Sequence, residues 1–403
     1  MSMPTVPEHL AAILALVSRP LEPIDLRLAD ALGCVLTEPL IASFDLPRFD
    51  NSSMDGYAVH SADVQRTPVT LPVVDDLAAT GRDGELAHLP AGCAARIMTG
   101  AQMPPGADAI VRVEWTDGNA EAVRIDQSVP AGQDLRRRGE DVISGDVVLP
   151  AGSTMGAAQL SLAAAFGRPT INVFRRPRVC VVSTGSELTE PAADVQLRAG
   201  AIFDSNSVAL QALATRADAD SVRLLAIPDD DLDFARAALT QAAQECDLLI
   251  TTGGVSAGAY EIMKDVMLDE RSVEFVKVAM QPGKPQGFGL FAGTPILTFP
   301  GNPVSAFVSF KLFAQPLIRK LAGHRNPTPD WRSATLAQPV TPRREVHMFP
   351  RAILDGSTNT VHFTGGSGSH LVGSLAQSNF LVNVPPGDQP LPVGTEVTGL
   401  TYN

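Results

Sequence analysis

Short apolar runs alternate with segments of helical spacing between about Pro177 and Gly323. Strands are predicted at 178–185, 221–228 and 247–254, helices at 204–217, 231–245 and 304–323, and the stretches 261–268, 273–280 and 294–303 continue the alternation. Such alternation is typical of a parallel sheet that carries helices on both faces. We therefore predict a doubly wound, mainly parallel α/β domain over residues 177–326.

The remainder of the chain has a different pattern, in which short β-prone runs are separated by Gly, Pro and Asp. Residues 51–141 are predicted to form an inserted β-rich domain, and residues 327–403 a C-terminal β-barrel or sandwich. Residues 27–50 and 142–176 flank the insertion, so we expect them to form one discontinuous linking domain. In residues 1–26, a Leu and Ile stripe with Pro7 in its first turn predicts a helix that packs on the body.

The segment Leu248–Lys264, LLITTGGVSAGAYEIMK, passes from an apolar run through paired glycines into a helical pattern. A strand, a loop of small residues and a helix start form the geometry in which backbone N–H groups receive an anion. The loop matches neither G-x-x-x-x-G-K-[ST] nor G-x-G-x-x-G, the two commonest nucleotide fingerprints. A phosphate-binding loop and a plain tight turn therefore both remain possible on this segment alone.

Several loops of unusual content follow the predicted strands of this domain. Ligands of open α/β sheets bind outside the carboxyl ends of the strands, which is where these loops lie. They are STGSEL with Glu187 after Gly185, the glycine loop with Glu261, FPGNPVSA with Pro300, Asn302, Pro303 and Ser305, and IPDDDLD with Asp229, Asp230 and Asp231. We expect a ligand crevice at this edge, although N-capping of the helix at 231–245 is a simpler role for at least one of the three aspartates.

The residue types at this edge indicate phosphate or oxyanion chemistry. Small residues and helix starts accept phosphates, Lys277 and Lys284 can neutralise them, and carboxylates can hold a divalent cation or orient an oxyanion. Histidine is absent from the domain until His324, so acyl transfer by an activated serine is excluded as a main hypothesis.

A second cluster of polar residues lies in the β-rich region, in 49–60, 95–114 and 136–146. Asp50 and Asp55 flank an Asn-Ser-Ser turn, for which an ordinary Asx turn is the alternative role. The run RRRGED at 136–141 also fits a solvated, ion-paired corner. The residues themselves thus predict two candidate sites in two domains.

Composition narrows the possible partners. The chain has 403 residues, 45% of them apolar and 19% charged, and a formal net charge of −13 that disfavours nucleic acid. No C-x-x-C pair or H-x-x-x-H spacing indicates a zinc site, and the four cysteines give no disulfide framework. No apolar stretch is long enough for a membrane span and the first residues do not resemble a signal peptide, so we expect a cytoplasmic protein without a membrane partner. All five lysines fall between 264 and 320, where a solvated helix face is the simpler explanation for most of them.

Eight motifs, in this order, resemble those of the molybdopterin molybdenumtransferases, the MoeA family that includes the E domain of gephyrin. They are FDNSSMDGYAV, RIMTGAQMPPGADAIV, RRRGEDVISGD, STGSEL, TTGGVSAG, QPGKPQGFG, FPGNPVSA and GSLAQSNFLVNVPPG. The resemblance implies an elongated four-domain homodimer, whose active site is formed by the α/β domain of one subunit and the inserted β domain of the other. It also implies a molybdenum insertase that takes molybdate and adenylylated molybdopterin and releases AMP in a Mg²⁺-dependent step.

The resemblance also assigns residues. The expected catalytic residues are Asp55, Thr99, Asp141, Glu187, Asp230, Glu261 and Lys277. The expected ligand-binding residues are Thr184, Gly185, Gly253, Gly254, Ser256, Lys284, Pro300, Asn302, Pro303 and Ser305. Glu187, Asp230 and Glu261 are the expected magnesium ligands, although the sequence does not separate metal ligands from proton donors among the carboxylates.

Two positions depart from the family pattern. Glu261 stands where many members have Asp, and Gln281 stands where many have Lys. Glu adds one methylene and can keep a metal or oxyanion contact, whereas Gln281 removes a positive charge. The family also implies further partners, the molybdopterin adenylyltransferase and acceptor molybdoenzymes. The alternative function is a non-catalytic dimeric scaffold of the gephyrin E-domain type, which would tolerate loss of the acidic residues that this chain mostly keeps.

Overall fold

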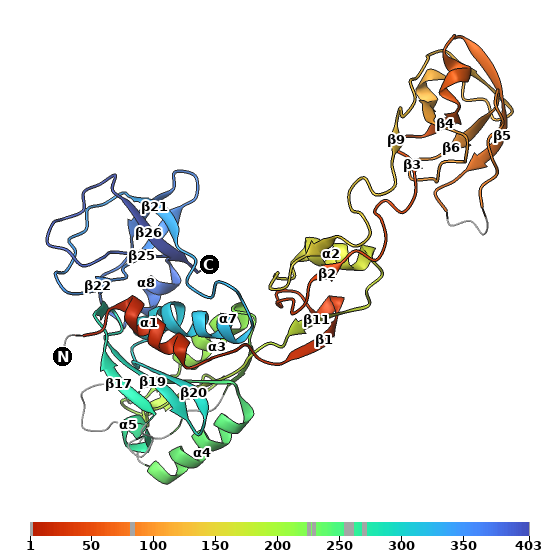
Figure 1. Ribbon diagram of the computed structural model, residues 1–403. Coiled ribbons are helices and arrows are strands. Elements are labelled where there is room, and N and C mark those ends of the chain that lie inside the picture. The colour runs from red at the N-terminus through yellow and green to blue at the C-terminus, as the bar shows by residue number, and fades with distance from the viewer. Residues whose placement is uncertain are drawn as a thin grey trace. The chain divides into compact units, whose positions relative to one another are not determined.

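The apolar runs of the α/β region form one six-stranded sheet, which lies between two layers of helices in Figure 1. The computed structural model describes residues 3–80, 85–223, 227, 231–253, 262–267 and 272–402. The strand order of the sheet is β15-β12-β16-β20-β19-β17. These strands are β12 (Arg178–Ser183), β15 (Asp220–Arg223), β16 (Leu248–Thr252), β17 (Val273–Lys277), β19 (Pro285–Phe291) and β20 (Thr294–Phe299).

The strand directions confirm a mainly parallel sheet and add one strand that the sequence did not predict. Strands β15, β12, β16 and β20 are parallel, but β19 runs antiparallel to both β20 and β17. The alternation of apolar runs predicted a parallel sheet and did not predict β19. Its sequence, PQGFGLF, contains Gly287 and Gly289, and these glycines interrupt the apolar pattern that identifies a strand. The sheet is therefore mixed, with a parallel centre.

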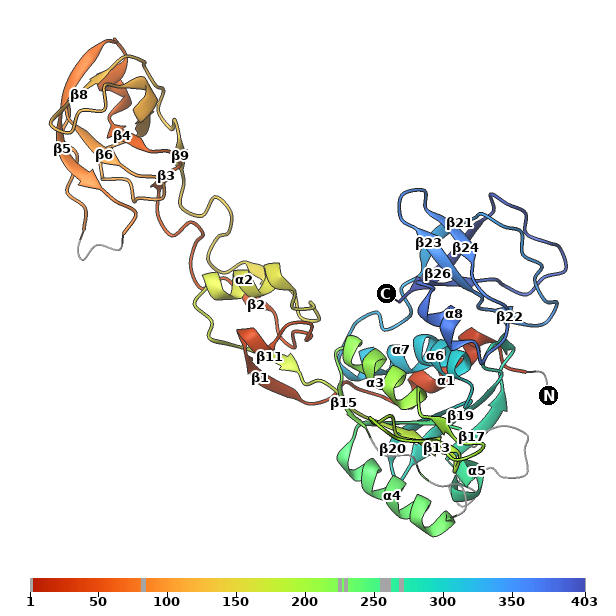
Figure 2. The ribbon, with the colours of Figure 1, turned by 180° about the vertical axis from the view of Figure 1, so that it is seen from behind.

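Helices cover both faces of the sheet, as the doubly wound pattern predicts (Figure 2). Along β12, Val179 and Val181 pack into one apolar core, while Cys180 and Val182 pack into the other. The helices of the first core are α1 (Val6–Ala15), α3 (Asn206–Arg216), α6 (Pro303–Ser309) and α7 (Gln315–Leu321), and those of the second are α4 (Leu232–Glu245) and α5 (Ile262–Met267). Strict alternation along a buried strand places neighbouring side chains on opposite faces.

Side-chain caps fix where these helices begin. Thr5 and Glu8 form a capping box at the start of α1, and a proline occupies its first turn as predicted. The Asp231 side chain accepts a 2.9 Å hydrogen bond from the Phe234 N–H, which confirms N-capping for one of the three consecutive aspartates. Asp229 and Asp230 lie outside the described residues.

The long helix predicted at 304–323 is present, with a π-helical segment, η4 (Phe310–Ala314), between α6 and α7. Pro316 lies in the first turn of α7 and has no N–H to offer to the preceding turn. A π-helical turn ahead of the proline is a known way to accommodate such a break in hydrogen bonding. The apolar pattern of the segment continues through it, so the sequence gives no sign of the change.

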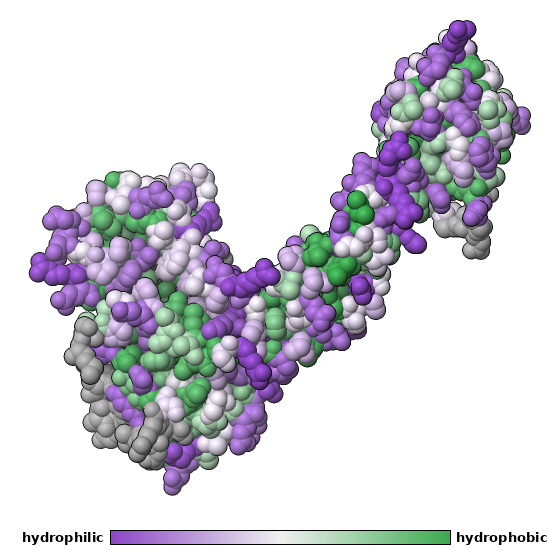
Figure 3. Space-filling model, viewed as in Figure 1, coloured by the Kyte–Doolittle hydropathy of each residue, from purple (hydrophilic) through white to green (hydrophobic). Residues whose placement is uncertain are grey.

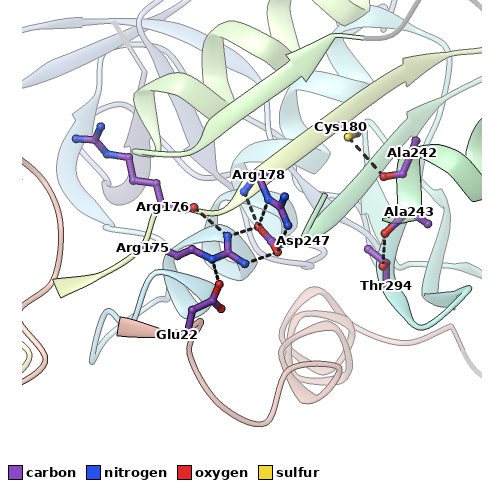
Figure 4. Close-up of polar contacts among 9 residues, drawn as sticks. All are labelled: Glu22, Arg175, Arg176, Arg178, Cys180, Ala242, Ala243, Asp247 and Thr294. Carbon is purple, nitrogen blue, oxygen red and sulfur yellow. Dashed lines mark hydrogen bonds and ion pairs between the residues drawn. The ribbon is translucent and has the colours of Figure 1, made fainter. Parts of the chain in front are cut away.

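An ion-pair cluster joins the start of β12 to the antiparallel pair β1 (Pro23–Arg27) and β11 (Thr170–Phe174) (Figure 4). Arg175 donates two hydrogen bonds, of 2.6 and 2.7 Å, to the Asp247 carboxylate, and it also contacts Glu22. Burial raises the pKa of Asp247, but the hydrogen bonds from Arg175 and Arg178 lower it on balance. The carboxylate is therefore held in its charged form at the base of the α/β domain.

The C-terminal region forms a closed five-stranded barrel. Of the two architectures predicted for it, the barrel is therefore the one present. Its strands are β21 (Arg332–Leu336), β24 (Thr360–Phe363), β23 (Arg351–Asp355), β25 (Phe380–Asn383) and β26 (Glu396–Thr401). Short strands β18 (Met280–Gln281) and β22 (His347–Met348) pair with each other, and Phe349, Leu381 and Tyr402 belong to the same apolar core as α6 and α7. The barrel thus packs directly on the α/β domain.

Tertiary contacts divide the chain into two units, one made of Met1–Thr37, Gly152–Leu160 and Thr170–Asn403, and one of Glu38–Ala151 and Ser161–Pro169. The second unit contains a five-stranded sheet of order β7-β4-β6-β5-β8 and the pairs β3-β9 and β10-β2. Its strands are β2 (Leu40–Ile41), β3 (Asn51–Ser52), β4 (Gly56–Val59), β5 (Val69–Leu77), β6 (Ala94–Ile97), β7 (Ala109–Arg112), β8 (Ala122–Ile125), β9 (Leu135–Arg136) and β10 (Val147–Leu149). The region 51–141 is β-rich, as expected, while the finer boundaries of the five predicted segments stay a prediction.

Helix α2 (Ala157–Ala165) follows β10 and contributes residues to both units. Among the described helices of the chain, none is both long and apolar enough to cross a membrane.

Candidate functional site

A cavity of about 1060 Å³ lies where β12, β16 and β20 end, which is the edge predicted to carry a ligand crevice. Its lining includes most of the ligand-binding residues expected from the sequence, namely Thr184, Gly185, Gly253, Lys284, Pro300, Asn302, Pro303 and Ser305. Glu187 lines the same cavity. Three loops that are far apart in the sequence therefore converge on one concave site.

Backbone hydrogen bonds bring these loops together. The Thr184 N–H donates to the Thr252 carbonyl at 2.9 Å, and the Gly253 N–H donates to the Phe299 carbonyl at 3.1 Å. Gly253 has a φ of +92°, and a Cβ added there would lie 2.5 Å from the carbonyl oxygen of Thr184. Only glycine permits both the conformation and the close approach.

Gly185 makes room for the Glu187 carboxylate. Its φ is +149°, and an added Cβ would lie 2.6 Å from Oε2 of Glu187. The Leu188 N–H donates to the Gly185 carbonyl at 3.1 Å, which closes the turn that carries Glu187. No described residue forms an ion pair with Glu187, so its carboxylate is available to a ligand or cation.

A hydrogen-bonded network behind the cavity links the ends of all three strands. Ser183 Oγ lies 3.1 Å from Asp204 Oδ1 and 3.3 Å from Thr252 Oγ1. Asn206 Nδ2 donates to the Gly301 carbonyl at 2.7 Å and lies 3.5 Å from Thr252 Oγ1. Asp204 and Asn206 line the cavity, yet the sequence suggested only a helix start for this segment.

The first residues of α6 form a further part of the wall. Asn302 is its N-cap residue and Pro303 occupies its first turn, while Ser305 is buried on the cavity side. The Val304 N–H donates to the Ser369 carbonyl at 3.0 Å, so the start of α6 is tied to the C-terminal domain.

Lys284 reaches the cavity from a tight connection between β17 and β19. The Val278 N–H donates to the Lys284 carbonyl at 2.8 Å, and the buried Gln286 amide donates to Gly283 O and Ser309 Oγ at 2.6 and 2.7 Å. These bonds fix the backbone from which Lys284 projects. Lys277 is exposed at the end of β17, opposite Pro285, and is not among the residues that line the cavity.

The C-terminal domain supplies a wall that the sequence did not indicate. Its lining residues are Arg343, Val346, Ser367, Ser369, His370 and Val372. The buried Arg351 donates to the carbonyl oxygens of Gly366 and Gly368 and so supports the loop that carries Ser367 and Ser369. The small-residue run GGSGSH at 365–370 is the one signal that could have marked this loop.

Charges of both signs meet in the cavity. Carboxylates come from Glu187 and Asp204, and cationic side chains from Lys284 and Arg343. Neither Lys284 nor Arg343 forms an ion pair with another described residue, so both are free to neutralise an anion. A site of this kind suits a phosphorylated ligand that carries or meets a cation.

In the second unit, two of the expected catalytic residues, Asp55 and Thr99, are in direct contact. Asp55 Oδ1 accepts hydrogen bonds from the Thr99 N–H at 2.7 Å and from Thr99 Oγ1 at 2.9 Å. The backbone bond first, and the side-chain bond second, lower the pKa of Asp55 below its usual value. Asp55 is therefore a fixed carboxylate on the surface of the β-rich unit. Its hydrogen bonds come from Thr99, not from the neighbouring backbone as in an Asx turn.

The arginine run at 136–138 forms the ion-paired corner that the sequence predicted as the alternative to a functional site. Arg138 pairs with Asp45, Arg137 lies 3.8 Å from Asp50, and the Arg137 N–H donates to Glu140 at 2.9 Å. Asp141 is exposed nearby, and its backbone N–H donates to the Leu46 carbonyl at 3.0 Å. This segment is a solvated, ion-paired corner. A catalytic role for Asp141 stays a prediction.

Four of the expected site residues, Asp230, Gly254, Ser256 and Glu261, lie outside the described residues. Within the described ranges, no group of three or more His, Cys, Asp or Glu side chains is placed to hold a metal ion. Of the three expected magnesium ligands, Glu187 alone is described. Gln281 lines the cavity, and its side-chain oxygen is buried without a hydrogen-bond partner among the described residues.

Family comparisons cover almost the whole chain. The family described as MoeA N-terminal region (domain I and II) matches residues 4–167. The family described as probable molybdopterin binding domain matches residues 180–320, and MoeA C-terminal region (domain IV) matches residues 333–401. The α/β domain and the barrel thus each match a family of their own.

Individual proteins show the same likeness over full length. Molybdopterin molybdenumtransferase 2 of Mycobacterium tuberculosis (strain ATCC 25618 / H37Rv) is 45% identical over 405 residues, which cover 98% of each chain. The molybdopterin molybdenumtransferase of Haemophilus influenzae is 34% identical over 383 residues, covering 94% of this chain and 93% of that one. The crystal structure of the molybdopterin biosynthesis moeA protein from Pyrococcus horikoshii OT3 matches with a TM-score of 0.83 and 26% identity, covering 100% of both chains.

The mixed α/β sheet, the C-terminal barrel and the cavity between their loops thus define a protein of the molybdopterin-binding MoeA type. The chain belongs to the molybdopterin molybdenumtransferase family. It is accordingly a transferase of molybdenum cofactor biosynthesis, and the family resemblance inferred from the eight sequence motifs is confirmed.

Proposed function

We propose that the cavity binds adenylylated molybdopterin and molybdate, and that the enzyme inserts molybdenum into the dithiolene with release of AMP. The observation that carries the proposal is the convergence of three small-residue loops, two carboxylates and two cationic side chains on one cavity. Neither cationic side chain has an ion-pair partner among the described residues. The cavity volume of about 1060 Å³ is near the upper end of the range for small-molecule sites, as a pterin nucleotide requires.

Anion binding is the task of the cationic side chains. Molybdate and the phosphates of the nucleotide are all anions, and each needs Lys, Arg or backbone N–H donors. Lys284 and Arg343 contribute from two separate segments, so one of them can serve the phosphates while the other serves molybdate. Acidic groups are also needed, because oxo groups of molybdate leave as water and must gain protons.

Glu187 is the described residue that fits Mg²⁺. The Glu187 carboxylate faces the cavity over Gly185 and has no ion-pair partner among the described residues, and carboxylate oxygen is a preferred ligand of Mg²⁺. Glu187 would hold the ion, and the resemblance adds Asp230 and Glu261 as further ligands. When bound, Mg²⁺ neutralises charge on the phosphates during cleavage of the anhydride. The Gly185 turn and the Thr184 hydrogen bond orient Glu187 for that contact.

The catalytic unit is proposed to be a homodimer, in which the Asp55 and Thr99 surface of one protomer completes the cavity of its partner. An exposed apolar patch of the second unit supports this proposal: Ile41 and Val147 pair across β2 and β10 and are 47% and 58% exposed, and Ile143 is 60% exposed. Figure 3 shows hydrophobic residues gathered over the segment that carries α2 and β2. Large exposed apolar patches mark interaction surfaces.

The protein partners and the cytoplasmic location of the enzyme are proposals as well. The reaction needs an enzyme that supplies adenylylated molybdopterin and a molybdoenzyme that accepts the product, both in the cytoplasm. Co-purification of the chain with a molybdopterin adenylyltransferase or with an acceptor molybdoenzyme would support these partners.

The experiment that tests the proposed function mixes the purified protein with adenylylated molybdopterin, molybdate and Mg²⁺ and measures AMP by chromatography. We expect molybdate-dependent AMP release, and a loss of about 10²-fold or more in Glu187→Gln, because the substitution removes a charged ligand at unchanged size. Asp388→Asn, in an exposed ion pair of the C-terminal domain, is the matched control. A scaffold without activity would release no AMP under any of these conditions.

A further inference from the structure

Asp204 is a buried carboxylate in the cavity wall, and among the described residues only one of its two oxygens has a hydrogen-bond donor. The residue is 3% exposed, and its Oδ1 accepts hydrogen bonds from Ser183 Oγ at 3.1 Å and from the Ser207 N–H at 3.0 Å. No residue of the described chain donates a hydrogen bond to Oδ2. Because Asp204 lines the cavity, a ligand bound there can donate an N–H to Oδ2.

The backbone around Asp204 is held in place. Strand β14 (Ile202–Phe203) pairs with β13 (Leu188–Thr189), the Ile202 N–H donates to the Glu187 carbonyl, and the Asp204 N–H donates to the Thr189 carbonyl, both at 2.9 Å. The carboxylate is thus fixed relative to the loop that carries Glu187. A fixed acceptor discriminates between ligands because it cannot turn away from an unsuitable one.

Two apolar residues precede Asp204 in the same wall. Ile202 and Phe203 both line the cavity and are 53% and 40% exposed. Exposed apolar side chains beside a hydrogen-bond acceptor suit a flat heterocycle, whose faces are apolar and whose edge is polar. This part of the cavity therefore matches a planar ring with N–H donors at its edge.

We propose that Asp204 Oδ2 accepts an N–H of the 2-aminopyrimidinone edge of the pterin and so places the pterin end of the substrate beside β14. The inference rests on the proposed function and adds a direction to the bound substrate. The pterin edge presents an amino N–H next to a ring N–H, so either group that faces Oδ2 is a donor to the charged oxygen. Adenine presents its amino group next to a ring acceptor, which a carboxylate repels.

The same assignment places the phosphates. Lys284 and Arg343 come from other segments of the wall than β14, and cationic side chains suit the phosphate end of the ligand. The substrate then lies with its pterin at Ile202–Asp204 and its phosphates toward Lys284 and Arg343. Asp204 is the specificity-determining residue of this arrangement.

The test is a fluorescence titration of the full-length protein with 6-hydroxymethylpterin and with 6-hydroxymethyllumazine, which has a carbonyl in place of the 2-amino group. Wild-type protein should bind the pterin about tenfold more tightly, since the lumazine presents an acceptor to the carboxylate. In Asp204→Asn the Oδ1 acceptor that caps α3 can be retained while Oδ2 becomes an N–H donor. Pterin binding should weaken about tenfold, and the preference should move toward the lumazine.

Two controls separate ligand recognition from helix capping. Ser183→Ala removes a donor to Oδ1 and leaves Oδ2 unchanged, so it should keep the preference for the pterin. Phe203→Ala removes ring contact and should weaken both ligands to a similar extent. Thermal unfolding of each variant reports on its folding.

The inference is overturned if wild-type protein shows no preference between the two ligands or binds neither. It is also overturned if folded Asp204→Asn keeps the wild-type preference, because Asp204 would then be a helix cap alone. If wild-type protein releases no AMP in response to molybdate, that result counts against the proposed function instead. The two failures are read from different assays and are therefore distinguishable.

Discussion

The Asn206 side chain donates a 2.7 Å hydrogen bond to the Gly301 carbonyl and thereby ties the start of α3 to the loop after β20. It also lies 3.5 Å from Thr252 Oγ1 at the end of β16. One amide thus connects elements whose loops form the cavity. Preorganised positions of this kind contribute to catalysis through geometry, because small displacements of binding groups reduce the rate.

Asn206→Ala should leave the protein folded and lower kcat/KM for AMP release about tenfold, since the loop at 300–303 loses its tether. Val208→Ala, at an exposed position of the same helix, is the matched control and should behave as wild type. Steady-state kinetics measures kcat/KM for AMP release, and thermal melting shows whether each variant is folded. An Asn206→Ala enzyme with wild-type kcat/KM would show that the tether has no part in the reaction.

Much of this site could be predicted because its residues follow strands that are evident locally. Thr184, Gly253 and Asn302 each come directly after an apolar run or before a helix start, so their shared edge follows from the topology. Asp204 and Asn206 were missed because a helix start gives the same local pattern whether or not it lines a cavity. Hydrogen bonds across 46 and 95 positions, from Asn206 to Thr252 and Gly301, leave no mark in the sequence nearby.

The contribution of the C-terminal domain could not be predicted for a related reason. Arg343 and His370 line the cavity because the barrel packs on α6 and α7, a contact between distant parts of the chain. Strand β19 was missed because its glycines break the apolar alternation on which strand prediction depends. The resemblance to the MoeA family supplied Asp55 and Thr99, whose hydrogen bonds the structure then shows.

Thr99→Val should raise the pKa of Asp55 toward its usual value, because one of the two hydrogen bonds to the charged carboxylate is lost. The backbone bond from residue 99 remains, so the pKa should stay below that of an unperturbed aspartate. Carboxyl ¹³C NMR titration measures the change, with Thr99→Ser as the control that keeps the hydroxyl. Equal Asp55 pKa values in wild type and Thr99→Val would contradict the role of the hydroxyl.

The buried His9 should make the protein sensitive to acid. His9 lies against the rings of Phe288 and Phe313, and burial lowers its pKa to about 4. Between pH 6.5 and 4 the unfolded chain takes up a proton that the folded protein excludes, so stability falls as pH decreases through this window. At pH 5 the effect of His9 is about 2 kcal/mol.

His9→Leu should remove that part of the acid sensitivity, measured as the difference in the free energy of unfolding between pH 7.5 and pH 5. His324, whose pKa burial also lowers to about 4, should preserve a similar remaining dependence. A His9→Leu variant with the full wild-type difference would show that α1 does not carry this response.

Mixing two inactive variants tests the shared active site of the proposed homodimer. Glu187→Gln alters the cavity and Asp55→Ala alters the β-rich unit, so a mixed dimer should contain one intact site and one doubly altered site. After subunit exchange, AMP release should recover to about a quarter of the wild-type rate, because half of the dimers are mixed and each has one working site. Mixtures that exchange subunits, as shown by affinity tags, and yet stay inactive would contradict a site built from two protomers.

The central claim is that cleavage of the adenylate and insertion of molybdenum occur together in this cavity. The most direct test measures molybdenum bound to the pterin product by mass spectrometry and AMP by chromatography in the same single-turnover reaction. We predict one molybdenum inserted per AMP released in wild-type protein, and neither product in Glu187→Gln. AMP release at an equal rate without molybdate, or without molybdenum in the product, would contradict the account.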